Sequence, residues 1–177
     1  YTSKIYSNVP EVFFNKSHVL LSQEKYDEAL IDINKAIDLD KKYSEAYNLK
    51  GLIFSKQKKF KESIEFFNNS IDINKHYIDA YKNLSLALKD LGDSDKAIEI
   101  LNIAIKNNSL INELYLHKGS ILKKNNQIDE AIECYDEAIK LIPNIAENYN
   151  ERGSAYLEIK KFDEAKKDFD KAIKLNY

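Results

Sequence analysis

The sequence has few of the residues that interrupt helices or cross-link a chain. It holds two prolines and four glycines in 177 residues, so tight β-turns are scarce and long helices are possible. A single cysteine, Cys134, excludes an intramolecular disulfide framework and fits a reducing compartment, so we expect a cytoplasmic protein. Methionine is absent and the sequence begins at Tyr1, from which we expect a fragment or processed form, which leaves a missing targeting segment open.

Long apolar runs and blocks of one charge are missing as well. No stretch approaches the roughly 20 apolar residues of a membrane span, and no secretory apolar core opens the chain. The 27 basic and 29 acidic residues are interspersed and give a net charge of -2. We therefore expect neither membrane insertion nor a dedicated nucleic-acid surface.

The sequence does contain a segment that recurs, with substitutions, at a period of 34 residues. The stretch NQIDEAIECYDEAIKLIP at 126–143 returns as KKFDEAKKDFDKAIKLNY at 160–177 and as EKYDEALIDINKAIDLDK at 24–41. Taking Pro10 as position 1 of the first repeat, the following repeats begin at Ser44, Ile78, Asn112 and Ala146. Self-similarity at a fixed period of this length is the signature of a repeat architecture.

Five columns of this alignment keep their chemical character throughout. Position 4 is aromatic, position 8 is small, positions 20 and 27 are alanine or serine, and position 24 is large and apolar. At position 8 the residues are Ser17, Gly51, Ser85, Gly119 and Gly153, and at position 24 they are Ile33, Phe67, Leu101, Tyr135 and Phe169. The apolar residues recur at helical spacing in two segments of each repeat, and acids open each second segment. Each repeat is therefore predicted to be a helical hairpin in which the small residue lets its partner helix approach closely.

This pattern of aromatic, small, alanine, large and alanine positions, with Pro143 near a repeat end, resembles the tetratricopeptide repeat. The resemblance covers residues 10–177 and implies an all-α solenoid of stacked antiparallel hairpins, a superhelix whose first helices line a concave surface. The expected repeats are 10–43, 44–77, 78–111, 112–145 and 146–177, preceded by a helical remnant or cap at 1–9. A basic residue replaces the usual leucine at position 7 in four repeats, at Lys16, Lys50, Lys118 and Arg152. We expect these long side chains to lie over apolar surface.

In this arrangement positions 2, 5, 6, 9 and 13 of each first helix face the concave groove. The resemblance makes the groove a peptide-binding site, and its candidate residues are Asn15, Asn48, Leu49, Leu52, Lys82, Asn83, Leu86, Leu116, His117 and Asn150. Every repeat carries an acid at position 2 along the groove edge, namely Glu11, Glu45, Asp79, Glu113 and Glu147. The asparagines offer donors and acceptors to an extended peptide backbone, and the leucines offer an apolar contact patch.

Each of these features also has a purely structural interpretation. The acids stabilise helix N-termini without any ligand, the asparagines reflect a composition rich in Asn, and the leucines pack between helices if the register is shifted. The clamp that some members of this family use to hold chaperone tails is not expected here. Lys82 matches its first element, but Leu86 stands where an asparagine is needed, and the acids at position 2 would repel a carboxylate.

Catalytic and metal-binding motifs are absent from the sequence. The three histidines lie in different repeats, and His117 is best interpreted as a solvated groove residue, although it could meet Glu113 and Glu151 in a weak metal or pH-sensing cluster. Cys134 is expected at a semi-exposed, tolerant position. We therefore predict no enzyme activity, cofactor or metal. The leading hypothesis is a scaffold that binds another protein or a peptide. The alternatives are self-association through uncapped ends and the substrate-selecting array of a larger enzyme, such as one resembling the glycosyltransferases that attach N-acetylglucosamine to Ser and Thr.

Overall fold

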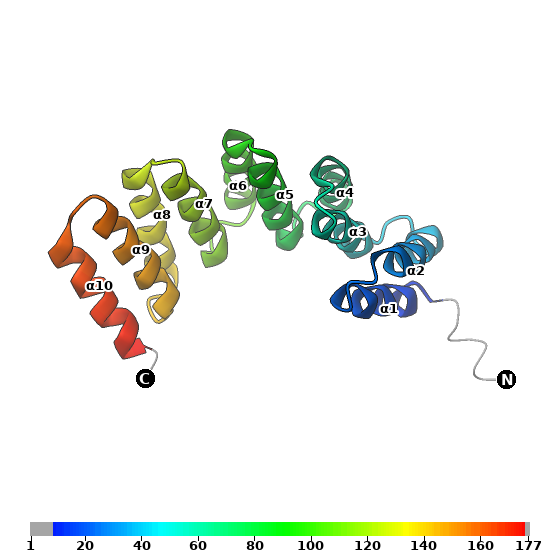
Figure 1. Cartoon of the computed structure of the whole chain (residues 1–177), viewed down its shortest axis with the longest axis horizontal. Coiled ribbons are helices and arrows are strands. Elements are labelled where there is room, and N and C mark those ends of the chain that lie inside the picture. Colours follow the sequence, from blue (N-terminus) through cyan, green and yellow to red (C-terminus); the bar gives the residue numbers. More distant parts are fainter. Residues whose placement is uncertain (1–8, 176–177) are drawn as a thin grey trace. The chain divides into compact units, whose positions relative to one another are not determined.

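The computed structural model describes residues 9–175, and this part of the chain forms ten α-helices and no β-strand (Figure 1). The all-α class predicted from the sequence is confirmed. The predicted helical piece at 1–9 lies outside the described residues, apart from Val9. The helices are α1 Pro10–Ser22, α2 Tyr26–Leu39, α3 Ser44–Lys56, α4 Phe60–Ile73, α5 Ile78–Leu91, α6 Ser94–Asn107, α7 Asn112–Lys124, α8 Ile128–Leu141, α9 Ala146–Glu158 and α10 Phe162–Leu175.

The turn between the two helices of a hairpin has one recurring backbone conformation. Position 15 of every repeat has a positive φ, near 60° at Glu24, Lys58, Asn126 and Lys160 and 95° at Gly92. After α1, the amide of Lys25 donates to the carbonyl of Leu20, and the amide of Glu24 donates to that of Leu21. This is the Schellman arrangement that ends a helix and satisfies its last carbonyl groups. Only one of the five repeats has the glycine that is usual in this arrangement, so the turn cannot be recognised from the sequence.

The helices fall into two compact units, which are described separately. Unit 1 ends at Gly92 and holds α1 to α5, whereas unit 2 begins at Asp93 and holds α6 to α10. In unit 1, α1 packs against α2 and α3 against α4, and each following first helix packs on the preceding second helix, α3 on α2 and α5 on α4. In unit 2, α7 pairs with α8 and α9 with α10, and α7 packs on α6 and α9 on α8.

The alternation of small and large residues builds the core of each hairpin. Ala29 and Ala36 in α2, and Ala131 and Ala138 in α8, are fully buried, as are the large residues Ile33 and Tyr135 between them. A β-carbon added to Gly51 would come within 2.5 Å of the Phe67 ring, and one added to Gly119 within 2.6 Å of the Tyr135 ring. Positions 8 and 24 are therefore in direct contact inside each of these hairpins, as the columns of the sequence indicate.

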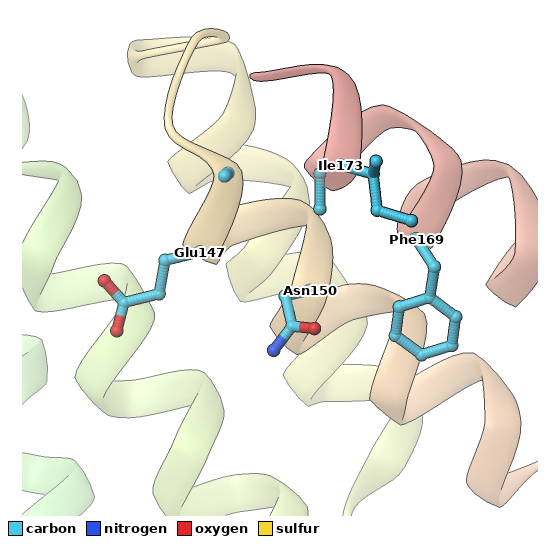
Figure 2. A pocket seen from close by; sticks show the side chains of 6 residues that line it. Glu147, Asn150, Phe169 and Ile173 are labelled. Atoms are coloured by element: carbon cyan, nitrogen blue, oxygen red, sulfur yellow. The ribbon is translucent and has the colours of Figure 1, made fainter. Parts of the chain in front are cut away.

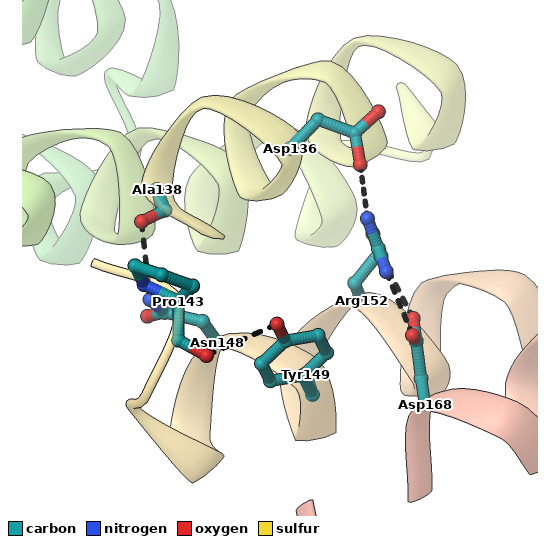
Figure 3. Close-up of polar contacts among 7 residues, drawn as sticks. All are labelled: Asp136, Ala138, Pro143, Asn148, Tyr149, Arg152 and Asp168. Atoms are coloured by element: carbon teal, nitrogen blue, oxygen red, sulfur yellow. Dashed lines mark hydrogen bonds and ion pairs between the residues drawn. The ribbon is translucent and has the colours of Figure 1, made fainter. Parts of the chain in front are cut away.

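A second pairing inside the hairpins joins position 7 to position 23. Lys16 Nζ lies 2.7 Å from Asp32 Oδ2, and the Arg152 guanidinium donates to both oxygens of Asp168 at 2.7 Å (Figure 3). Both aspartates are almost completely buried. In the second repeat the same two positions hold Lys50 and Phe66, and the lysine ammonium lies 4.2 Å from the ring centroid. In these three repeats the basic residue at position 7 therefore contacts the residue at position 23.

The buried acid of the first hairpin makes stability depend on pH. Burial alone would raise the pKa of Asp32, but the hydrogen bonds and charges of Lys16 and Lys35 hold this pKa below its usual value. Because the folded-state pKa is depressed, the ion pair stabilises the protein above the unfolded-state pKa of about 3.9 and loses its effect as the pH falls through the folded-state pKa.

We expect Lys16→Ala to lower the free energy of unfolding by about 1 kcal/mol at pH 7 and to have a smaller effect at about pH 2, because the contribution of the ion pair decreases as Asp32 becomes protonated. Urea unfolding of wild type and variant at the two pH values measures this difference. Lys41→Ala is the matched control, because Lys41 pairs only with the exposed Asp38, and its removal is expected to be silent at both pH values. An equal loss at both pH values for Lys16→Ala would show that Lys16 acts through packing rather than charge.

Candidate functional site

Two adjoining hollows lie along the first helices of unit 1. One, of about 260 Å³, is lined by residues of α1, α3 and the start of α5. They are Phe14, His18, Glu45, Asn48, Leu49, Leu52, Tyr77, Asp79, Lys82 and Asn83. The other, of about 400 Å³, is lined by Leu52, Ser55, Lys56, Lys58, Phe60, Phe67, Asn83, Leu86 and Asp90. The two hollows share Leu52 and Asn83, and together they are called the unit 1 groove below.

The leucines of the unit 1 groove differ in how much surface they offer. Leu52 and Leu86 are half-buried and line the groove. Leu49 is only 2% exposed and belongs to the core cluster that contains Ile33 and Ile53. Leu49 therefore contributes mainly to the stability of unit 1, and the apolar surface open to a ligand comes from Leu52 and Leu86.

Acids give the first hollow a negative character. Burial, together with the charges of Asp79 and Glu45, raises the pKa of Tyr77 to about 12. Burial raises the pKa of Tyr43 as well, and the charges of Glu11 and Glu45 add to this effect. Lys82 lies 3.2 Å from Asp79 and offsets part of this charge. The acids at position 2 of two successive repeats thus lie close enough to one tyrosine to raise its pKa together. Their negative charges favour a cation at the edge of the hollow.

The asparagines of the unit 1 groove bond to each other. Asn83 Nδ2 donates to Asn48 Oδ1 at 2.9 Å, and Asn48 Nδ2 donates to the Tyr77 hydroxyl at 3.3 Å. Asn48 is buried and both ends of its amide are used within the unit. The alternation of asparagine between positions 5 and 6 therefore has a structural cause, since position 6 of one first helix bonds to position 5 of the preceding one. Asn83, which lines both hollows, is the amide that the groove presents.

The remaining predicted groove residues lie elsewhere. Asn15 and Glu11 are exposed on α1 but do not line the unit 1 groove. In unit 2, Leu116 packs against the core cluster of α7, α8 and α9, while Asn150 and Glu147 line a hollow of about 480 Å³ with residues of α10. Glu113 and His117 also lie in unit 2, on α7, where Glu113 is exposed and His117 is half-buried. Within unit 1, the structure thus brings together the predicted residues of repeats 2 and 3.

Two expectations about reactive groups are answered by the packing. Lys123 Nζ lies 2.8 Å from Glu151 Oε2 and also contacts Ser154, so the acid suggested as a partner of His117 is bound by a lysine. Within residues 9–175 no three His, Cys, Asp or Glu side chains are placed to hold a metal ion together. Cys134 is buried rather than semi-exposed, because position 23 faces the hairpin interior, and burial raises the pKa of its thiol.

None of the described helices has the length and apolar character needed to cross a membrane.

Family comparisons agree with the repeat pattern and the hairpins. A tetratricopeptide repeat model matches residues 10–43, 44–77 and 78–109, a second matches 146–176, and a TPR repeat model matches 119–160. These matches cover most of the chain. The chain belongs to the tetratricopeptide repeat (TPR) family. No curated protein matches the sequence significantly.

Solved structures with the same TPR fold include those of MamA, YrrB and PilF. A crystal structure of MamA shares 23% identity at a TM-score of 0.75, covering 94% of this chain and 91% of that one. YrrB, described as a TPR protein with an unusual peptide-binding site, shares 22% identity at a TM-score of 0.68, covering 97% and 89%. PilF of Pseudomonas aeruginosa shares 14% at a TM-score of 0.80, covering 93% and 75%. At these identities the likeness shows the fold alone.

One residue of the TPR groove was missed by the sequence analysis. Tyr77 stands at position 34, just before a first helix, where the other repeats carry Tyr43, Ile111 and Ile145. The signal is the column of large residues at position 34, which the sequence analysis did not include among the groove positions. Because the connection turns back toward the groove, its last side chain lines the first hollow.

Proposed function

We propose that this TPR protein is a non-catalytic scaffold whose unit 1 groove binds an extended peptide segment of a partner protein. The observation that carries the proposal is the pair of adjoining hollows, in which half-buried Leu52 and Leu86 lie beside polar groups that point to the same surface. Concave sites that combine apolar surface with a few convergent polar groups are the usual binding sites of proteins.

The chemistry of the groove indicates what the segment contains. Leu52 and Leu86 suit one or two apolar anchors, and Glu45 and Asp79 suit a lysine or arginine placed beside them. Asn83 can hydrogen-bond to the peptide backbone. Anchors that become fully desolvated carry most of the affinity, while charges at the rim act mainly on the encounter rate and its salt dependence. The expected ligand is therefore a segment with apolar residues and a flanking cation.

Selection from a random peptide library against the whole chain tests this proposal. We expect selected peptides to be rich in apolar residues with a lysine or arginine nearby. Leu52→Asp and Leu86→Asp should each weaken binding by at least tenfold, because an unpaired carboxylate would be buried against the anchor. Glu45→Lys together with Asp79→Lys should weaken it less, and chiefly at low salt. Fluorescence anisotropy with a selected peptide measures these affinities.

Ile31→Asp is the matched control, since Ile31 is a similarly sized apolar residue exposed on α2 and does not line the unit 1 groove. Binding that survives both leucine substitutions would move the site away from this groove. Binding that is abolished by charge reversal and unaffected by the leucine changes would make the acids the recognition element. Circular dichroism of each variant shows that the helices are intact.

A further inference from the structure

The first and last described helices expose surfaces that are buried everywhere else in the chain. Positions 3 and 10 of a first helix face the preceding hairpin. In α3, α5, α7 and α9 these side chains are at most 2% exposed; they are Ala46, Ile53, Ala80, Ala87, Leu114, Ile121, Asn148 and Ala155. In α1 the same positions are Val12 and Val19, which are 45% and 53% exposed. Valine lies within the size range that the interior junctions accept at these positions.

The opposite surface lies on α10. Position 24 is completely buried in α2, α4, α6 and α8, each of which is covered by a following first helix, whereas Phe169 is only half-buried. Position 28 is isoleucine in all five repeats; Ile37 is 8% exposed and Ile173 is 56% exposed. Together with Phe162 at position 17, these residues form an apolar stripe along α10. The hollow of about 480 Å³ between α9 and α10 is lined by Glu147, Asn150, Phe169 and Ile173, as Figure 2 shows.

Two polar contacts join neighbouring hairpins inside the chain. The α1 surface carries one partner of each contact, and the surface of α9 and α10 carries the other. At the junction of α3 and α5, Asn83 at position 6 donates to Asn48 at position 5 of the preceding first helix. Position 5 of α9 is Asn150, and position 6 of α1 is Asn15. Both of these asparagines are exposed, so α9 presents one half of the pair and α1 presents the other.

The second contact is an ion pair. At the junction of α8 and α9, Arg152 at position 7 reaches back to Asp136 at position 25 of the preceding second helix, with Nη1 2.5 Å from Oδ1 (Figure 3). Position 25 of α10 is Asp170, which is exposed, and position 7 of α1 is Lys16, whose side chain is 64% exposed. The first three repeats carry asparagine at position 25, so this acid is specific to the last two hairpins.

From this complementarity we infer that α1 of one copy of the chain docks on α9 and α10 of a second copy, as the next first helix of a continuous stack. Val12 and Val19 pack on Phe162, Phe169 and Ile173, Asn15 pairs with Asn150, and Lys16 pairs with Asp170. Lys166 replaces the usual apolar residue at position 21, and its alkyl stem covers apolar surface while its ammonium stays in water. The contact is heterologous, so it leaves one surface of each kind open at the ends and adds further copies head to tail.

Sedimentation velocity of the 177-residue chain over a range of concentrations tests the inference. We expect dimers and larger species to increase with concentration. Val19→Asp blocks the α1 surface and Ile173→Asp blocks the α10 surface, so each variant alone should be monomeric. An equimolar mixture of the two should form dimers and nothing larger, because each dimer uses the one intact surface of each variant. Asp170→Lys should weaken wild-type association roughly fivefold.

Ile31→Asp is the matched control and should associate like wild type, since Ile31 is exposed on α2 away from both surfaces. A wild-type chain that stays monomeric up to about millimolar concentration, where the weakest specific contacts form, would overturn the inference. Dimers of either single variant would indicate a symmetric contact, and a monomeric mixture would show that the surfaces do not meet; both results contradict head-to-tail docking. Peptide binding in the unit 1 groove should be unchanged in both variants, so the two proposals fail independently.

Discussion

Replacing Gly51 by serine is expected to lower the free energy of unfolding by about 2–3 kcal/mol, although serine is the better helix former. The new β-carbon would lie 2.5 Å from Cε1 of Phe67, whose ring is completely buried, so the ring and its packing partners must shift to accept it. The helix-propensity gain is at most about 0.5 kcal/mol, so the steric term decides the sign. Urea unfolding followed by circular dichroism measures the change.

The other repeats supply the compensating substitution. Glycine at position 8 is paired with an aromatic residue at position 24 in three repeats, whereas Ser17 is paired with Ile33. The Ser17 hydroxyl donates to the carbonyl of Ala29 at 2.9 Å, so the serine is satisfied where it fits. Combining Gly51→Ser with Phe67→Ile should therefore recover most of the lost stability, although Phe67→Ile alone leaves a cavity and costs about 1–2 kcal/mol. Additive losses in the double variant would show that the two positions do not share one space.

This coupling explains why the sequence predicted the hairpins so well. Each hairpin needs a small residue at position 8 and a filled position 24, and any insertion would separate them, so the 34-residue period marks the helices reliably. The first helices begin at Pro10, Ser44, Ile78, Asn112 and Ala146, the residues from which the repeats were counted. The repeated sequence therefore reflects the packing of residues that are close together in the chain.

The candidate site was less accessible to sequence reasoning, because it depends on contacts between repeats. The sequence predicts that Asn48 and Asn83 offer their amides to a peptide backbone, but the two bond to each other across a junction. Leu49 and Leu52 share the groove-facing helix α3, yet only Leu52 leaves much of its surface open. Columns of one alignment do not show which residues of successive repeats meet.

The pairing of positions 7 and 23 gives a second large expected effect. Arg152→Leu should lower the free energy of unfolding by about 3–5 kcal/mol, because it leaves the carboxylate of Asp168 buried without a partner. The guanidinium also holds Asp136, and its carbon Cζ lies 5.7 and 5.8 Å from the ring centroids of Tyr149 and Tyr156. Asp136 is half exposed and regains water when the arginine is lost, so most of the expected loss comes from Asp168.

The sequence of the third repeat has no charge at the same two positions, since it carries Leu84 at position 7 and Ile100 at position 23. Arg152→Leu combined with Asp168→Ile should therefore unfold at a urea concentration close to that of wild type, because replacing a buried ion pair by apolar residues of similar volume is often neutral or stabilising. The loss of the contacts to Tyr149 and Tyr156 sets a residual cost of about 1 kcal/mol. A double variant as unstable as Arg152→Leu would mean that the tyrosines and Asp136, rather than the buried aspartate, account for the role of Arg152. Asp168→Ile alone should lie between the two, since it leaves a cation that keeps its partner at Asp136.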